Sequence, residues 1–158
     1  MKIIKVENNK KKYLDLLLLG DEQESMIDLY LDKGDMFVAA DNGVKAECVV
    51  VKCEDRVYEL KNIAVAPEFQ RMGYGKKLVE YILSYYNDCD TMYVGTGDSE
   101  KTLNFYKACG FKESHRVKNF FVDNYALIYI ISHIRNPIIQ YKYFYFNNQL
   151  FFNKYSSL

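Results

Sequence analysis

The chain has 158 residues, of which 21 are Lys or Arg and 21 are Asp or Glu, so its formal net charge is zero. This length predicts one domain with a sizeable core, and the balanced charge argues against nucleic acid or an anionic membrane as the main partner. No apolar run approaches the about 20 residues that span a bilayer, and the N-terminus does not continue into a signal peptide, so we expect a cytoplasmic protein.

Apolar and polar residues alternate in several segments, as in half-buried strands. The predicted strands cover residues 2–6, 36–40, 44–52, 58–66, 91–94 and 111–117. An Asn42-Gly43 turn separates the second and third of these, and it is typical of a β-hairpin because both residues tolerate positive φ. Residues 36–66 therefore predict three adjacent antiparallel strands.

Other segments have apolar residues at helical spacing. The predicted helices cover residues 8–20, 22–32, 76–86 and 99–108. Asn8 or Asn9 is expected to cap the first helix and Asp98 or Ser99 the last, while Gly110 is expected to end the last. The order of elements predicts an α/β fold with a mixed sheet, in which one strand-helix-strand crossover makes a parallel pair.

The last thirty or so residues differ from the rest. Residues 126–131 are apolar, Pro137 follows, and residues 138–152 are dense in Tyr and Phe. Two segments are candidates for a last strand, 127–131 and 141–146, and we expect the first. A dimer contact, a divergent end to the fold and a frame-shifted C-terminus would all look alike here, so a homodimer is one expectation among these.

Cysteine and histidine usage limits the chemistry. The four cysteines have no C-x-x-C spacing, and the two histidines are not placed to complete a metal site. We therefore expect reduced, mostly buried thiols and no metal centre. A mechanism built on a His-centred triad also has little material, since only His115 and His133 are present.

The segment that follows the strand at residues 58–66 predicts an anion-binding loop. Pro67 ends the strand, and Gly73 and Gly75 permit a tight path into the next helix. Free N–H groups at a helix N-terminus, reinforced by the helix dipole, bind phosphate groups. Positive charge around this loop comes from Arg71, Lys76 and Lys77. The spacing matches neither the P-loop nor the dinucleotide-binding motif.

The six residues Gln70-Arg71-Met72-Gly73-Tyr74-Gly75 resemble the Q/R-x-x-G-x-G/A signature of the GNAT-type N-acetyltransferases, whose loop holds the diphosphate of acetyl-CoA. Residues 102–111 resemble the second conserved block of that family. The resemblance implies a GNAT-like, mostly antiparallel sheet flanked by helices, with a parallel, splayed strand pair at the CoA site. It covers about residues 1–125, the expected acetyltransferase domain, and leaves residues 126–158 as an aromatic-rich C-terminal segment of the same domain.

The resemblance also implies acetyl-CoA as co-substrate and assigns its binding residues. These are Ile63, Ala64, Val65, Gln70, Arg71, Met72, Gly73, Tyr74, Gly75, Lys76 and Asn104. The backbone of the first three would pair with the pantetheine arm as an added strand, and an N–H there could polarise the thioester carbonyl.

Three residues are candidates for catalysis. Tyr106 matches the family tyrosine that donates a proton to the departing thiolate, a role that a phenol suits; the alternative is a core tyrosine. Glu59 is expected to accept the proton of the amine, directly or through water. Asn62 could orient that water, although simple alternation places it opposite Glu59 unless the strand has a bulge near Asn62.

The predicted function is transfer of an acetyl group from acetyl-CoA to a primary amine of a small molecule or a protein. Acids in the second predicted helix point to a cationic amine, and they are otherwise ordinary exposed side chains. These acids are Glu22, Glu24 and Asp28; the resemblance implies that they and Tyr30 border the groove of the acceptor substrate. Two further possibilities are a catalytically silent CoA-binding regulatory module and a phosphate-binding α/β domain for another nucleotide.

Overall fold

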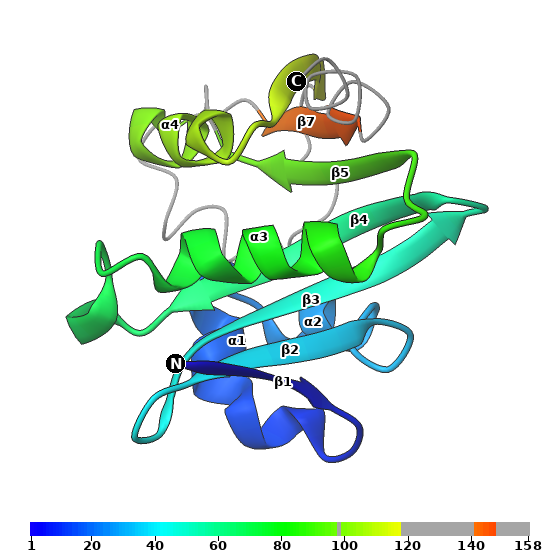
Figure 1. The fold of residues 1–158 in the computed structure, drawn as a ribbon. Coiled ribbons are helices and arrows are strands. Elements are labelled where there is room, and N and C mark those ends of the chain that lie inside the picture. The colour runs from blue at the N-terminus through cyan, green and yellow to red at the C-terminus, as the bar shows by residue number, and fades with distance from the viewer. Residues whose placement is uncertain (98, 118–140, 148–158) are drawn as a thin grey trace. The chain divides into compact units, whose positions relative to one another are not determined.

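The computed structural model of the protein describes residues 1–97, 99–117 and 141–147 (Figure 1). These residues belong to two compact units. The first contains Met1–Met92 and also Asn147, and the second contains the described part of Tyr93–Phe146.

Four antiparallel strands in the order β1-β2-β3-β4 form the sheet of the first unit (Figure 1). Their bounds are Lys2–Val6 (β1), Asp35–Ala40 (β2), Val44–Glu54 (β3) and Val57–Val65 (β4). One row of the register runs across all four strands through Ile4, Val38, Glu47 and Ala64. The three adjacent antiparallel strands predicted from residues 36–66 are thus confirmed.

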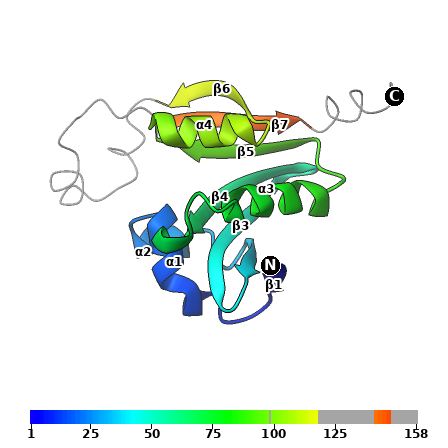
Figure 2. The same cartoon turned by 60° about the vertical axis from the view of Figure 1, so that its left-hand side comes forward.

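Helices cover both faces of this sheet (Figures 1 and 2). They are the 3-10 turns η1 (Lys10–Tyr13) and η2 (Pro67–Phe69) and the α-helices α1 (Leu14–Gly20), α2 (Glu24–Asp28) and α3 (Tyr74–Tyr85). The α1 and α2 helices lie on one face, where Leu17, Ile27 and Val49 are buried in a common core. On the other face, Tyr81 and Tyr85 of α3 pack edge-on against Phe37.

Two predicted helices differ from the observed ones at their ends. The helix expected over residues 22–32 is limited to Glu24–Asp28. Beyond this helix, the Lys10 ammonium group donates hydrogen bonds to the carbonyl oxygens of Leu31, at 2.9 Å, and Gly34, at 2.6 Å. In the first helix, Asn9 has φ 52° and makes no side-chain capping bond, and the chain passes through η1 before α1 begins.

The described residues of the second unit form the helix α4 and strands in the order β5-β7-β6. Its elements are β5 (Thr91–Thr96, which begins in the first unit), α4 (Glu100–Ala108), β6 (Lys112–Val117) and β7 (Tyr141–Asn147). Strands β6 and β7 are antiparallel. The predicted helix stop is confirmed, because Gly110 has φ 91° and directly follows Cys109, the C-cap of α4. Ser99 is the N-cap residue without a side-chain capping bond, and Asp98 lies outside the described residues.

The sequence alternatives for the last strand have different outcomes. The expected segment, residues 127–131, lies outside the described residues, whereas the other candidate, residues 141–146, forms β7. Phe144 of β7 is fully buried. The predicted α/β class with a mostly antiparallel sheet is confirmed. Among the described residues, no helix combines the length and the apolar character needed to cross a bilayer.

Candidate functional site

A short connection joins the end of β4 to the start of α3. Pro67 begins η2, where its fixed φ and missing N–H are suited to the first position of a helical turn. The side-chain amide of Gln70 donates a hydrogen bond to the carbonyl oxygen of Val65 at 3.3 Å. Gln70 thereby holds the connection against the end of β4.

Two residues of this connection have positive φ. The values are 63° at Arg71 and 87° at Gly73. A non-glycine residue at positive φ is uncommon, and such strained positions gather at binding sites. Among the described residues, nothing lies within 4 Å of the position that a Cβ on Gly73 would take. The backbone here is open to an approaching ligand.

The first turn of α3 offers free N–H groups and carries positive charge. Gly73 is its N-cap, and no side-chain cap or acidic residue serves this turn in the part of the chain that the structure describes. The first bond of the helix runs from the N–H of Lys77 to the carbonyl of Gly73 at 3.0 Å, which leaves the preceding N–H groups without a helical acceptor. Lys76 and Lys77 at a helix N-terminus oppose the helix dipole. An anion bound there would accept hydrogen bonds from these N–H groups and offset the positive charge of the lysines.

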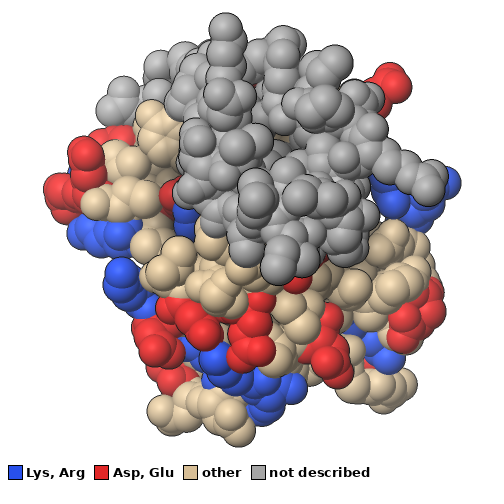
Figure 3. Space-filling model, turned by 180° about the vertical axis from the view of Figure 1, so that it is seen from behind, with Lys and Arg blue, Asp and Glu red and all other residues tan. Residues whose placement is uncertain are grey.

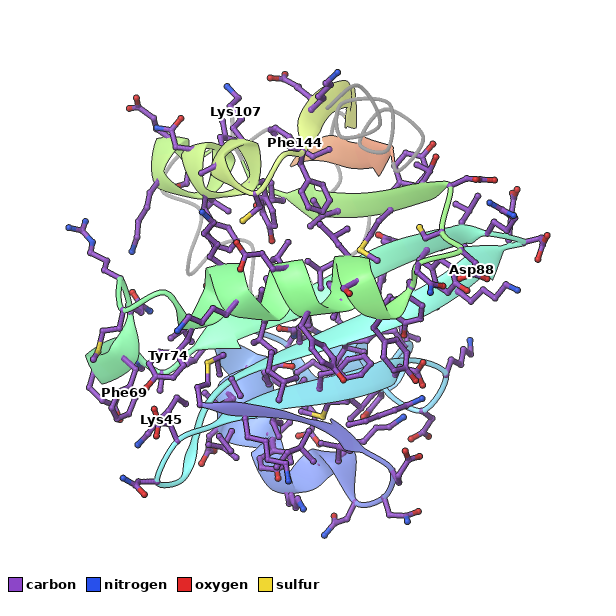
Figure 4. The ribbon with its side chains drawn as sticks, viewed as in Figure 1. Lys45, Phe69, Tyr74, Asp88, Lys107 and Phe144 are labelled. Carbon is purple, nitrogen blue, oxygen red and sulfur yellow. The ribbon has the colours of Figure 1, made fainter. Side chains whose placement is uncertain are left out.

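An aromatic and charged cluster supports the loop from the side of the β2–β3 hairpin (Figure 4). The Lys45 ammonium lies over the Phe69 ring, 3.9 Å from its centroid. Phe69 packs edge-on against Tyr74, with ring centroids 6.1 Å apart, and the Tyr74 hydroxyl donates to an Asp41 carboxylate oxygen at 3.3 Å. The N–H of Ala66 also donates to the Lys45 carbonyl at 2.9 Å. The hairpin therefore fixes both ends of η2.

The predicted conflict between Glu59 and Asn62 is resolved by the register of β4. Asn62 is opposite Val49 and Glu59 is opposite Val51, with a register shift between Val49 and Val50. Lys61 is the additional residue of a bulge, so Glu59 and Asn62 lie on the same face of the sheet. The Glu59 carboxylate forms an ion pair with the Lys61 ammonium at 3.1 Å.

Asn62 connects β4 to the helices on that face. Its side-chain nitrogen donates to the carbonyl of Leu17 at 2.9 Å and to the Tyr30 hydroxyl at 2.8 Å. The carbonyl partner fixes the orientation of the amide, because only an N–H can be donated to it. The remaining oxygen lies against Gly20, where a Cβ would come within 2.0 Å of it. Both N–H groups of Asn62 are therefore used in packing α1 and Tyr30 onto the sheet.

Most acids considered for substrate contact on α2 are paired. Lys11 forms ion pairs with Glu24 at 2.9 Å and with Asp28 at 2.6 Å. In the view from behind, acidic and basic side chains are interspersed over the described surface (Figure 3). No group of His, Cys, Asp or Glu suited to a metal ion occurs among the described residues.

Glu47 is a buried acid that the sequence pattern does not single out. Its side chain is fully buried, and its carboxylate oxygens have no hydrogen-bond partner within the described residues. Burial raises the pKa of Glu47 to about 8; the Ala64 backbone opposes this rise but makes no hydrogen bond of good geometry to the carboxylate. The available signal was a lone acid within the apolar run from Ala46 to Val51.

The remaining predicted residues belong to the second unit. Tyr106 on α4 is 5% exposed and packs against the rings of Phe111, at 5.8 Å, and Phe144, at 6.2 Å between centroids. Asn104 is exposed on the same helix. The proton-donor role of Tyr106 and the cofactor contact of Asn104 stay predictions.

Comparisons with known proteins agree on one family. Residues 32–113 match the family model described as an acetyltransferase (GNAT) domain. A Bacillus subtilis (strain 168) protein named uncharacterized N-acetyltransferase YvbK is 34% identical over 123 residues, which cover 75% of this chain and 79% of that protein.

Two solved structures are similar over most of the chain. A Bacillus subtilis acetyltransferase in complex with CoA has a TM-score of 0.80 and 28% identity, with 92% of this chain and 97% of that chain covered. A GNAT family acetyltransferase from Elizabethkingia anophelis with acetyl-CoA bound has a TM-score of 0.79 and 30% identity, with the same coverage.

Proposed function

The chain belongs to the GNAT family of acetyltransferases, and from this premise we propose that it transfers the acetyl group of acetyl-CoA to a primary amine of a small molecule or a protein. The observation that carries the proposal is the uncapped, positively charged start of α3 behind the open Gly73 backbone. The similar acetyltransferases with CoA or acetyl-CoA bound support the same ligand.

The loop fits the diphosphate of acetyl-CoA in shape and in charge. Arg71 and Gly73 turn the backbone so that successive N–H groups can converge on one anion, as in other nest-like phosphate sites. Lys76 and Lys77 add positive charge in the same turn. The binding residues are those predicted from the sequence: the N–H groups of Arg71, Met72, Gly73, Tyr74, Gly75 and Lys76, with Gln70 holding the loop.

The chain's own groups would orient the reaction and move its protons. Acetyl-CoA supplies an acetyl group activated as a thioester. The backbone of Ile63, Ala64 and Val65 aligns that thioester, and an N–H among them polarises its carbonyl. Tyr106 donates a proton to the departing thiolate, and Glu59 is a candidate to take a proton from the amine.

A thiol-release assay tests this function. The protein is incubated with acetyl-CoA and a panel of primary amines, and free thiol and product mass are followed. We expect thiol release that depends on the amine, together with a product heavier by one acetyl group. Binding of acetyl-CoA without release for any amine would instead support a catalytically silent CoA-binding module. Tighter binding of another nucleotide than of acetyl-CoA would contradict the proposal that acetyl-CoA is the ligand.

A further inference from the structure

Every unpartnered buried side-chain atom in the described part of the chain is a hydrogen-bond acceptor. These atoms are both carboxylate oxygens of Glu47, Oε1 of Gln23 and Oδ1 of Asn62. The Asn62 oxygen lies against Gly20, so Glu47 and Gln23 are the side chains with acceptor capacity left. A ligand that satisfies them must bring N–H or O–H donors.

Glu47 has the strongest need for such a donor. Its register neighbours, Val38 on β2 and Ala64 on β4, are apolar. An ionised carboxylate in such surroundings is strongly disfavoured unless a positive partner is present. Native proteins rarely keep a buried charged group without a partner. A cationic ligand would convert this unfavourable group into a binding contact.

The position of Glu47 relates it to the acetyl group. Glu47 is directly opposite Ala64, and opposed residues of antiparallel strands have Cα atoms about 5 Å apart. Ala64 is the centre of the Ile63–Val65 backbone assigned to the thioester. Glu59 is five residues from Ala64 along β4, which corresponds to about 16 Å at 3.3 Å per residue. Glu47 is therefore the acid closer to the assigned position of the acetyl group, and among the described residues it has no ion-pair partner of the kind that Lys61 is for Glu59.

We propose that Glu47 binds the ammonium group of the acceptor and accepts the proton that this group must lose before it attacks the acetyl carbon. In this step an N–H bond of the ammonium breaks, an O–H bond forms on Glu47, and the nitrogen keeps the electron pair used in the attack. The inference rests on the proposed function and extends it: the molecule that receives the acetyl group is a cationic primary amine.

The test compares an alkylamine, which is cationic at neutral pH, with an arylamine, which is uncharged. For Glu47→Gln we expect kcat/KM to fall at least 100-fold with the alkylamine and less than 10-fold with the arylamine, with the Kd for acetyl-CoA unchanged. Glu54→Gln is the matched control, since Glu54 is exposed on the same strand, and it should leave both rates unchanged. For Glu59→Gln the alkylamine loss should be smaller than for Glu47→Gln.

Equal losses for the two amines, or no loss, would overturn the role of Glu47. If the wild-type protein releases thiol for none of the amines tested, that result would instead overturn the proposed function. If Glu47→Gln does not fold, infrared difference spectra of the wild-type protein give a second readout. Binding of the alkylamine should replace a carboxylic acid C=O band by a carboxylate band, and an unchanged acid band would contradict the proposal.

Discussion

Glu47 on β3 is paired in register with Ala64 on β4, so a fully buried carboxyl group lies one strand away from the backbone that we assign to the acetyl group. This pairing places an acid in the sheet core where its only described neighbours across the strands, Val38 and Ala64, are apolar. The stability of the protein should therefore report the protonation of this group.

The first prediction is that Glu47 makes the folded protein less stable as the pH rises. Burial raises the pKa of Glu47 from its ordinary 4.5 to about 8, so between these values the folded state keeps a proton that the unfolded chain releases. The free energy of unfolding should fall by about 3–4 kcal/mol from pH 5 to pH 8 through this group alone. Urea denaturation of wild type and Glu47→Gln measures it as a pH-dependent difference between the two. Parallel pH profiles would show that Glu47 titrates normally.

The second prediction concerns the open backbone at Gly73. Gly73→Ala adds a Cβ at φ 87° and on the side where we place the diphosphate, so acetyl-CoA binding should weaken at least 10-fold. Gly43→Ala in the β2–β3 hairpin is the control, because Gly43 has φ 103° and, within the described part of the chain, a Cβ there meets only the Lys45 ammonium, at 3.9 Å. Both variants should lose about 1 kcal/mol of stability. Calorimetry that finds the same weakening of binding in both would assign the effect to backbone strain.

The third prediction concerns the contact between Lys45 and Phe69. Lys45→Met removes the cation over the Phe69 ring and should weaken acetyl-CoA binding about 3- to 10-fold, because the loop loses support worth about 1 kcal/mol. Lys52 is on the same strand as Lys45 and forms an exposed ion pair with Asp55. Lys52→Met therefore removes the same charge and should not change acetyl-CoA binding. The Kd values of the two variants, measured at equal ionic strength, decide between support of the loop and a general effect of charge.

The fourth prediction separates a catalytic tyrosine from a structural one. Tyr106→Phe should lower kcat by about 10²-fold or more while the Kd for acetyl-CoA stays the same. Tyr86→Phe should lower the free energy of unfolding by about 1–3 kcal/mol, because it removes a 2.7 Å hydrogen bond to the Asp35 carboxylate, and should leave kcat unchanged. A Tyr106→Phe variant with full turnover would mark Tyr106 as a core residue of the second unit.

Local signals predicted the segment from β4 to α3 well. Alternation marks the strand, Pro67 ends it, and the apolar spacing marks the helix, all within thirty residues. Only the helix start was misplaced: α3 begins at Tyr74, because Gly73 at positive φ is already its N-cap. The bulge near Asn62 was recognised as a condition rather than predicted, since it appears only in the pairing with β3.

Features that depend on distant contacts could not be predicted in this way. The second helix ends at Asp28. In the residues after it, the carbonyls of Leu31 and Gly34 accept hydrogen bonds from Lys10, more than twenty residues away in sequence. The contacts of Asn62 with Leu17 and Tyr30 likewise join residues far apart in sequence.

The burial of Glu47 and the choice between the two candidates for the last strand both depend on distant parts of the chain. Glu47 is fully buried in the folded chain, and a single acid within an apolar run does not reveal that burial. Residues 127–131 and 141–146 have similar strand patterns, and only the pairing with β6 identifies the second as a strand.

The most direct test of the account is an amide NMR titration of the protein with acetyl-CoA. We predict that the N–H signals from Arg71 to Lys76 shift downfield together, as expected for hydrogen bonds to a diphosphate, while the signal of Gly43 does not move. Saturable binding that shifts amides elsewhere and leaves those six unchanged would contradict the assignment of this loop as the CoA site.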